Sequence, residues 1–275
     1  MEVPGRIPKI DEFFSGKKIK SSFIFLHKLR IRAFITANCS NYSKYVVSCM
    51  YKKNSIILSS VPLKNLPNLW AQNDVLIFLI DLGDYDTLSM ECLNNSEREN
   101  LEKLKTEYFK KRYIVSRMVL KHILCKLLNK TSVLEISTCK DKFGEVHILS
   151  HKELHICISY SENIATLAVS KVKVGIDVEI KRPLALKNTL KYLKPVSQFS
   201  DKSESDAYIL IGWTLREAYC KFSNESMLSV LGKEPDFNNI FYSSYLLDNK
   251  YVFSLITDSD SHTIKISRLG KISSD

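Results

Sequence analysis

The stretch Gly175-Ile176-Asp177-Val178-Glu179 places two carboxylates two residues apart in a segment whose other side chains are small or β-branched. Isoleucine and valine favour β-structure, so we predict a strand over residues 174–180. Side chains two apart on a strand share a face, which puts Asp177 and Glu179 on one side of it. Gly175 has no side chain, and we expect this to let a ligand approach the strand closely.

A second segment, Trp213-Thr214-Leu215-Arg216-Glu217-Ala218-Tyr219-Cys220-Lys221, follows about one helix further along the chain. We predict a helix from residue 203 to about residue 222, on which Glu217 and Lys221 lie on one face. Trp213 precedes Glu217 by one turn and is expected to anchor this helix. Taken alone, each segment has an ordinary explanation, because strands carry acidic pairs by chance and helices carry surface ion pairs.

Together the two segments supply three carboxylates and a lysine: Asp177, Glu179, Glu217 and Lys221. Converging carboxylates form a hard, oxygen-rich site that suits Mg²⁺, which takes one or two carboxylates and then phosphate oxygens of a substrate. Mn²⁺ is the expected substitute. The lysine suits the phosphate itself. The sequence therefore predicts a metal site with Asp177, Glu179 and Glu217 as ligands.

The whole chain has the composition of an ordinary globular protein. Its 275 residues are 45% hydrophobic and 25% charged, enough for one large domain or two smaller ones. The longest strongly apolar run, Val75 to Ile80, is much shorter than the about 20 residues of a membrane span. The start of the chain lacks the pattern of a signal peptide. Seven scattered cysteines without a CxxC pair favour a reducing cytoplasm over disulfides or structural zinc.

Positive charge is concentrated at the start of the chain. Residues 1–70 hold 12 Lys or Arg and 3 Asp or Glu, whereas residues 71–275 hold 28 and 27. A basic surface favours acidic partners and speeds encounter with them. The charge alone does not distinguish a nucleic acid, a membrane or an acidic protein from a solvated basic face without a partner. We find no aromatic–basic interleaving typical of a nucleic-acid motif, so we expect no nucleic-acid partner.

Hydrophobic periodicity predicts further elements. Residues 1–70 are expected to be β-rich, because apolar and basic residues alternate over 29–32 and short apolar runs occur at 45–47 and 56–58. Ser96 and Glu99 form a predicted capping box, and a helix or helix pair runs from there to about Leu128. Its basic face holds Lys103, Lys105, Lys110, Lys111, Arg112, Arg117 and Lys121, which without other context is a solvated charged face. Strands are predicted at 75–80, 154–160, 163–170, 250–257 and 262–268, the last two as a hairpin around residues 258–261.

Two further features have ordinary structural explanations. His147, His151 and His155 are spaced four apart, as on one helical face. The alternation around His155 indicates a strand, so we do not expect a zinc site there. Cys220 is next to Lys221, and we expect it to be a packing residue.

The two acidic segments resemble those of the 4′-phosphopantetheinyl transferases of the surfactin-synthetase-activating type. That family carries Gly-Ile-Asp-x-Glu, which matches Gly175 to Glu179. Some 35 to 45 residues later it carries Trp-Ser/Thr-x-Lys-Glu-Ala/Ser-x-x-Lys, which matches Trp213 to Lys221 with Arg216 in place of the first lysine. The resemblance covers roughly residues 73–270.

Upstream the resemblance is looser and includes departures. The family segment Phe-Asn-x-Ser-His-Ser aligns with 156–161, where Tyr160 replaces the histidine. The family segment Tyr/Phe-Gly-Lys-Pro aligns with 143–146, where Glu145 reverses the charge of the lysine. The Gly-rich turn after the second motif is replaced by Asn224-Glu225-Ser226. These departures imply altered or weaker coenzyme A binding and leave the carboxylates untouched.

The resemblance implies an activity. Family members transfer the 4′-phosphopantetheine group from coenzyme A to a serine of an acyl or peptidyl carrier protein and release adenosine 3′,5′-bisphosphate. Catalytic roles would fall to Glu217, Lys221 and Asp177, with Glu217 taking the serine proton directly or through a metal-bound water and Lys221 contacting the pyrophosphate. The coenzyme would be held by residues of the basic helix, of the aligned strand and of the second motif: Lys103, Arg112, Arg117, Ser159, Tyr160 and Lys221.

The resemblance also implies a fold and partners. We expect an α+β fold of two pseudo-symmetric halves, each a small sheet packed on helices, at 72–171 and at 172–275 with the metal site. A basic, β-rich extension at 1–71 precedes them. The expected partners are coenzyme A and an acidic carrier protein of fatty acid, polyketide or nonribosomal peptide biosynthesis, and the expected state is a cytoplasmic monomer. The alternative is a catalytically weakened family member that acts as a basic binding module.

Overall fold

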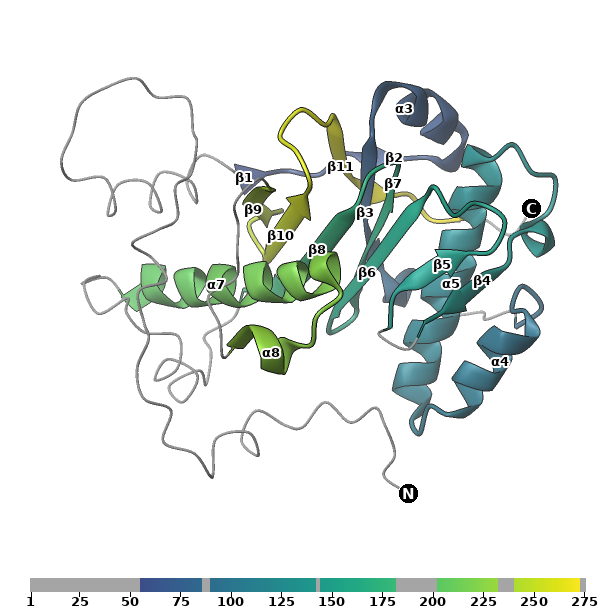
Figure 1. The fold of residues 1–275 in the computed structure, drawn as a ribbon, viewed down its shortest axis with the longest axis horizontal. Helices are drawn as coiled ribbons and strands as arrows, with labels where there is room; N and C mark the ends of the chain where they lie inside the picture. Colours follow the sequence, from purple (N-terminus) through teal and green to yellow (C-terminus); the bar gives the residue numbers. More distant parts are fainter. Residues whose placement is uncertain (1–54, 86–89, 142–143, 182–201, 232–239, 273–275) are drawn as a thin grey trace.

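The structure is a computed structural model that describes residues 55–85, 90–141, 144–181, 202–231 and 240–272. Within them the chain is a mixed α and β structure in which two sheets pack on helices (Figure 1). The β-runs expected at 29–32 and 45–47 lie outside the described residues. No helix of the described chain has the length and apolar character needed to cross a membrane.

The larger sheet has seven strands in the order β2-β11-β3-β7-β6-β5-β4. Its strands, in chain order, are β2 (Ser60–Val61), β3 (Val75–Asp81), β4 (Thr138–Lys140), β5 (Val146–Ile148), β6 (His155–Ser161), β7 (Ile164–Ser170) and β11 (Ile264–Leu269). The strands predicted at 75–80, 154–160 and 163–170 are confirmed within a residue or so. β3 pairs with β7 in antiparallel fashion and with β11 in parallel.

The smaller sheet has four strands in the order β1-β9-β10-β8. They are β1 (Ser55–Ile56), β8 (Val174–Ile180), β9 (Phe241–Leu247) and β10 (Tyr251–Thr257). The strand predicted at 174–180 is confirmed. β10 is flanked by β8 and β9 on its two edges, both antiparallel.

The predicted hairpin of residues 250–268 is wrong. β10 and β11 follow one another in sequence, but they belong to different sheets. Both edges of β10 are already hydrogen-bonded to β8 and β9, so no edge remains for β11. β11 instead extends the larger sheet beside β3.

Helices cover the outer faces of the sheets. They are α3 (Leu66–Gln72), α4 (Asn95–Glu102), α5 (Glu107–Leu127), α7 (Lys202–Ser223) and α8 (Met227–Leu231), with short 3₁₀ turns at Leu63–Asn65, Leu82–Asp84 and Val133–Glu135. The predicted helix pair before Leu128 is thus α4 and α5, and the helix predicted at 203–222 is α7. The capping box lies two residues earlier than predicted, because Asn94 rather than Ser96 caps α4 with Glu97. Thr106 caps α5 by accepting from Phe109 N.

The strands at the centre are buried on both faces, which gives the molecule four layers (Figure 1). Along β3, Leu76, Phe78 and Ile80 belong to the core shared with α5. The alternate residues Val75, Ile77 and Leu79 belong to the core between the two sheets. On the far side of the smaller sheet, Leu210 and Ile211 of α7 pack with Val252 of β10. The order of layers is therefore α5, larger sheet, smaller sheet, α7.

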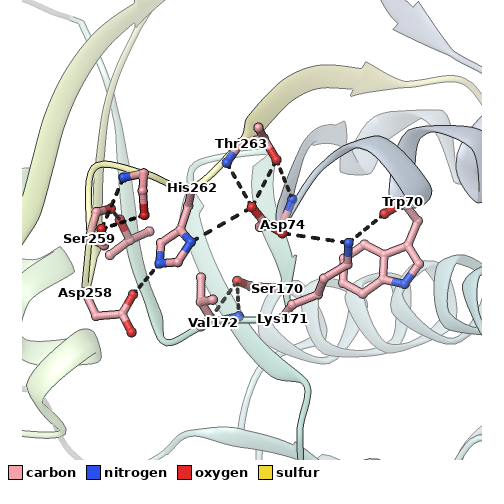
Figure 2. Close-up of polar contacts among 11 residues, drawn as sticks. Trp70, Asp74, Ser170, Lys171, Val172, Asp258, Ser259, His262 and Thr263 are labelled. Carbon is pink, nitrogen blue, oxygen red and sulfur yellow. Dashed lines mark hydrogen bonds and ion pairs between the residues drawn. The ribbon is translucent and has the colours of Figure 1, made fainter.

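A polar junction ties the two sheets together at one end (Figure 2). Asp74 Oδ2, just before β3, accepts from Thr263 N and Thr263 Oγ1, both at 3.0 Å. Lys171, in the turn between β7 and β8, donates to the carbonyl of Trp70 at 2.9 Å. His262 contacts Asp258 at 2.8 Å within the loop between β10 and β11. These bonds fix the crossing from β7 to β8 and from β10 to β11, where the chain passes between the sheets.

Segments from the expected N-terminal extension join both sheets. β1 pairs with β9 in the smaller sheet, and β2 pairs with β11 in the larger one. β11 in turn lies beside β3, so strands cross the expected boundaries near residue 72 and near residue 172.

Candidate functional site

Gly175 is the point where α7 crosses β8. A Cβ atom on Gly175 would lie 2.1 Å from the carbonyl oxygen of Ala218 and 2.7 Å from Phe222 N. Real Cβ atoms do not approach a backbone atom that closely, so any larger residue would push the helix away from the strand. The prediction that Gly175 admits a ligand is therefore wrong: the missing side chain admits the helix that carries Glu217 and Lys221.

Strand alternation then determines what faces the helix. Ile176 and Val178 belong to the core between the sheets. Gly175, Asp177 and Glu179 occupy the opposite face, as predicted from their spacing of two. The acidic face of β8 is thus turned toward α7.

Asp177 is the centre of the cluster, and only 2% of it is exposed. Its Oδ1 accepts from Ser159 Oγ at 2.6 Å and from Lys221 Nζ at 2.8 Å. Its Oδ2 is buried and has no hydrogen-bond donor in the described part of the chain as long as Glu217 is ionised. A buried carboxylate oxygen without a donor is costly, so this oxygen marks a place where a cation or a proton is needed.

Glu217 adjoins Asp177 and responds to its charge. Burial and the Asp177 carboxylate raise the pKa of Glu217 to about 8, and the nearby Lys221 opposes this shift. A hydrogen bond with Asp177 adds to the shift, because the Glu217 carboxyl donates only when it is protonated. At neutral pH and without a cation, Glu217 therefore holds a proton.

Lys221 keeps its charge in spite of its surroundings. Burial disfavours the ammonium form, but Asp177, Cys157 and Glu217 outweigh this and raise the Lys221 pKa above its ordinary value. The side chain is 30% exposed. A lysine whose ammonium group is held against buried carboxylates, and whose side chain is partly exposed, is well placed to meet an anionic ligand.

Glu179 is held by the neighbouring strand of the other sheet. Ser161 Oγ donates to Glu179 Oε2 at 2.9 Å, and the same hydroxyl accepts from Ile180 N at 2.9 Å. Ser159 has the same arrangement one step back, since it bonds Asp177 and accepts from Val178 N at 3.4 Å. Polar residues on one face of β6 thus position both acidic residues of β8.

The carboxylates of this cluster have the chemistry that a divalent cation requires, but their oxygen atoms are not close enough together to form a closed ligand set. Three carboxylates, one of them with an unpartnered buried oxygen, face a single lysine in this cluster. In the described residues, the group whose metal-ligand atoms all lie within 4.8 Å of one another is a different one: Asp141, Glu145 and His147. The carboxylates of β8 and α7 are therefore more widely spaced than a closed ligand set while Lys221 occupies Asp177.

The group Asp141, Glu145 and His147 lies beside β5, apart from the cluster on β8. His147 Nε2 is 3.4 Å from Asp141 Oδ2 and 4.0 Å from Glu145 Oε2, and the three side chains are partly exposed. The three histidines with a spacing of four are distributed over different elements. His147 is on β5, His155 is on β6, and His151 contacts Glu153 in the turn between these strands.

The residues predicted to hold coenzyme A divide into separate places. Ser159 and Tyr160 are neighbours on β6 and so point to opposite faces. Ser159 bonds Asp177, whereas Tyr160 Oη lies 2.6 Å from Ser116 Oγ on α5. The Arg112 guanidinium stacks on the Tyr160 ring at 4.3 Å from its centroid.

The basic face of α5 is only partly solvated. Lys103 is exposed at the end of α4. Arg117 is 3% exposed and lies over the ring of Tyr113 at 5.2 Å. Lys121 is 1% exposed and pairs with Glu97 at 2.7 Å. The prediction of a solvated face is therefore wrong for Arg117 and Lys121, because Arg117 is buried over the Tyr113 ring and Lys121 is buried against Glu97 of α4.

The sequence analysis assigned no role to several residues that complete these contacts. Ser161 and Ser116 bond Glu179 and Tyr160, and Tyr113 stacks under Arg117. The one available signal is the alternation Cys157, Ser159, Ser161, which places three polar side chains on one face of a buried strand.

No protein-family model matches the chain, and no curated protein matches it at a significant level.

Proposed function

We propose that the protein transfers the 4′-phosphopantetheine group of coenzyme A to a serine of an acyl or peptidyl carrier protein, with release of adenosine 3′,5′-bisphosphate. The observation that carries this proposal is the meeting of β8 and α7 at Gly175. It places Glu217 and Lys221 against Asp177, whose second oxygen has no donor. This is the residue set on which the resemblance to the 4′-phosphopantetheinyl transferases rests.

The cluster suits the chemistry of such a transfer. Asp177, Glu179 and Glu217 would hold Mg²⁺, which would offset the negative charge of the pyrophosphate. Lys221, whose side chain is partly exposed, would contact the pyrophosphate oxygens. Glu217, in its ionised form, would accept the proton of the attacking serine hydroxyl. Catalysis would consist mainly of positioning and charge stabilisation.

The order of elements supports the proposal of two similar halves. β3, α5, β6 and β7 occur in this order in the first half of the described chain, where α4, β4 and β5 are additional elements. β8, α7, β9 and β10 occur in the second half, where α8 is additional. In each set the first strand pairs in antiparallel fashion with the last, and the last pairs with the third. The carboxylate cluster lies where β8 of the second set meets β6 of the first.

The coenzyme would bind beside β6 and α5. Arg112 is held over the Tyr160 ring, and Arg117 is buried with its Nε and Nη1 atoms unpartnered in the described residues. Lys103 is exposed at the end of α4, and we propose it as a contact only for the part of the coenzyme that faces solvent. The acceptor would be an acidic carrier protein in the cytoplasm, attracted by the basic charge of the chain.

A weakened family member that acts as a basic binding module is the second candidate. The observation that favours it is Glu145, which contacts His147 and lies beside Asp141 at the position where the family has a lysine. Tyr160 carries no charge at the position of the family histidine.

One experiment separates the two. An apo acyl carrier protein is incubated with the full chain, coenzyme A and Mg²⁺, and the intact mass of the carrier is measured. The transferase predicts a gain of one phosphopantetheine that disappears with EDTA and with Asp177→Ala. Several carrier classes without any gain, although the protein is folded, would contradict it and favour the binding module.

A further inference from the structure

The edge of the larger sheet carries metal-ligating side chains on one of its two faces. β4 is the edge strand, and β5 lies between it and β6 (Figure 1). On β5, Val146 and Ile148 belong to the core shared with α5. His147, the residue between them, therefore projects from the opposite face of the sheet. The pairing of the strands determines which side chains lie beside it.

The strand register puts His147 in a row with a cysteine and a second histidine. Cys139 of β4 is the direct partner of His147. Val146 of β5 is the partner of Ile156 on β6. The next pair in this antiparallel register is therefore His147 and His155. Directly opposite residues have Cβ atoms about 4.5–5.5 Å apart, so the two imidazole rings are neighbours on this face.

The turn from β4 to β5 adds two carboxylates to the same face. Asp141 is two residues after Cys139, and Glu145 is two residues before His147, so both continue the alternation of their strands. Asp141 N donates to the carbonyl of Glu145 at 3.0 Å, and Glu145 N donates to Asp141 Oδ1 at 2.9 Å. These two bonds hold the ends of the turn together and leave Asp141 Oδ2 beside the His147 ring.

The ligand atoms of the turn are close to the spacing of a tetrahedral metal site. One ligand atom each of Asp141, Glu145 and His147 lies within 4.8 Å of the others. Ligands of Zn²⁺ at about 2.0–2.2 Å from the ion are about 3.3–3.6 Å from one another in a tetrahedron. His147 Nε2 is 3.4 Å from Asp141 Oδ2 and 4.0 Å from Glu145 Oε2, so the first distance fits and the second needs a small side-chain rotation. All three side chains are partly exposed, which gives an ion access from solvent.

The types of ligand select the metal. Imidazole nitrogen suits Zn²⁺, whereas Mg²⁺ and Ca²⁺ prefer oxygen ligands alone. Burial lowers the pKa of His155, so its ring is neutral at neutral pH and can offer a nitrogen to a metal. Mn²⁺ has the lowest affinity of the divalent first-row metals for such ligands, so it would not compete with Zn²⁺ here.

We propose that Asp141, Glu145, His147 and His155 form a zinc site that joins the turn between β4 and β5 to β6. The sequence argued against zinc at the three histidines because a strand, and not a helix, contains His155. Pairing of two strands nevertheless brings together two of the three, and the zinc ion would be held by these two and the carboxylates of the turn.

The zinc site is distinct from the carboxylate cluster on β8. On β6 the same face carries His155 at its start and Ser159 and Ser161 further along, and these two serines bond Asp177 and Glu179. The zinc site shares no ligand with that cluster, and it does not depend on the proposed transfer reaction.

Zn²⁺ affinity tests the site directly. It is measured for the full chain by competition with a chromophoric chelator, in excess Mg²⁺, and each of the three histidines is replaced in turn. His147→Gln and His155→Gln should each weaken the binding of one zinc ion by more than about 100-fold, because loss of an outer-shell partner alone costs about 10–100-fold. His151→Gln is the matched control and should keep the wild-type affinity, since its ring contacts Glu153 at 3.0 Å.

Three results would overturn the proposal: no zinc ion bound by the wild type, wild-type affinity in either His147→Gln or His155→Gln, or an equal loss in all three variants. Asp177→Asn keeps the outcome separate from the proposed function, because it should retain this zinc ion and transfer nothing. Zinc binding that needs His147, in a protein that modifies no carrier, would support this site and contradict the proposed function alone.

Discussion

Lys121 and Lys221 each lie against a buried carboxylate, but the two clusters differ in what they leave unpaired. Lys121 and Glu97 are each 1% exposed and are surrounded by donors and acceptors from α4, β4 and the chain before α4. Lys221 is 30% exposed, and its partner Asp177 retains one buried oxygen without a donor. Burial and the adjacent Asp177 carboxylate raise the pKa of a second carboxyl group, Glu217, to about 8.

The difference indicates what each cluster does. A complete ion pair needs nothing further and holds α4 and α5 to the sheet. A cluster with excess negative charge favours the binding of a cation, and it binds a proton when no metal is present. A buried charge is therefore informative about function when its partners are too few, and about stability when they suffice.

Replacement of each lysine by methionine should show the largest difference between the two clusters, as a loss of stability. Lys121→Met leaves Glu97 buried without its partner and should cost about 3–5 kcal/mol of stability. Lys221→Met should cost about 1–2 kcal/mol, because Ser159 still donates to Asp177 and a proton on Glu217 lowers the local charge. Chemical denaturation measures both values.

Divalent cations should separate the same variants further. Mn²⁺ should restore the stability of Lys221→Met, since the cation takes the place of the ammonium group. It should not restore Lys121→Met. Rescue of Lys121→Met by Mn²⁺, or of neither variant, would argue against the distinction between the two clusters.

Gly175→Ala should move α7 away from β8 and so separate Glu217 and Lys221 from Asp177. Its Cβ would collide with the Ala218 carbonyl at 2.1 Å, so α7 must move away from β8, at a cost of about 2–3 kcal/mol. Gly212→Ala is the matched control on the same helix, because nothing lies within 4 Å of the added Cβ. Thermal melts should show a lower Tm for Gly175→Ala and an equal or higher Tm for Gly212→Ala. Similar melting of the two variants would mean that the close crossing is not required.

The pH dependence of stability should reveal Glu217. Its folded pKa, about 8, is above the ordinary value of 4.5, so the folded state binds the proton more tightly than the unfolded state. Its contribution is fully present below about pH 4.5 and is lost as pH rises toward about 8. In EDTA we expect the wild type to lose about 1–2 kcal/mol over this range relative to Glu217→Gln, with solvent and Lys221 moderating the effect. Parallel pH profiles for the two proteins would contradict the shift.

The sequence was sufficient for the elements that carry the cluster. Residues 174–180 and α7 follow from local patterns, alternation on the strand and a spacing of four on the helix. Asp177 and Glu217 face each other because Gly175 lets α7 approach β8. The sequence shows that Gly175 has no side chain, but not whether a ligand or a helix occupies the space. The neighbour of a strand is also not a local property, so the partner of β11 was predicted wrongly. The burial of Lys121 depends on Glu97, a residue on another helix, and no spacing within α5 could show it.

The most direct test of the account is a Mn²⁺ titration of the full chain, with free Mn²⁺ followed by its electron paramagnetic resonance signal. Asp177→Asn and Asp141→Asn remove one carboxylate each from the two groups that could hold a cation. We predict one tight ion that is lost in Asp177→Asn and retained in Asp141→Asn, with affinity that rises with pH through about 8 as Glu217 gives up its proton. An ion that is retained in Asp177→Asn and lost in Asp141→Asn would contradict the account.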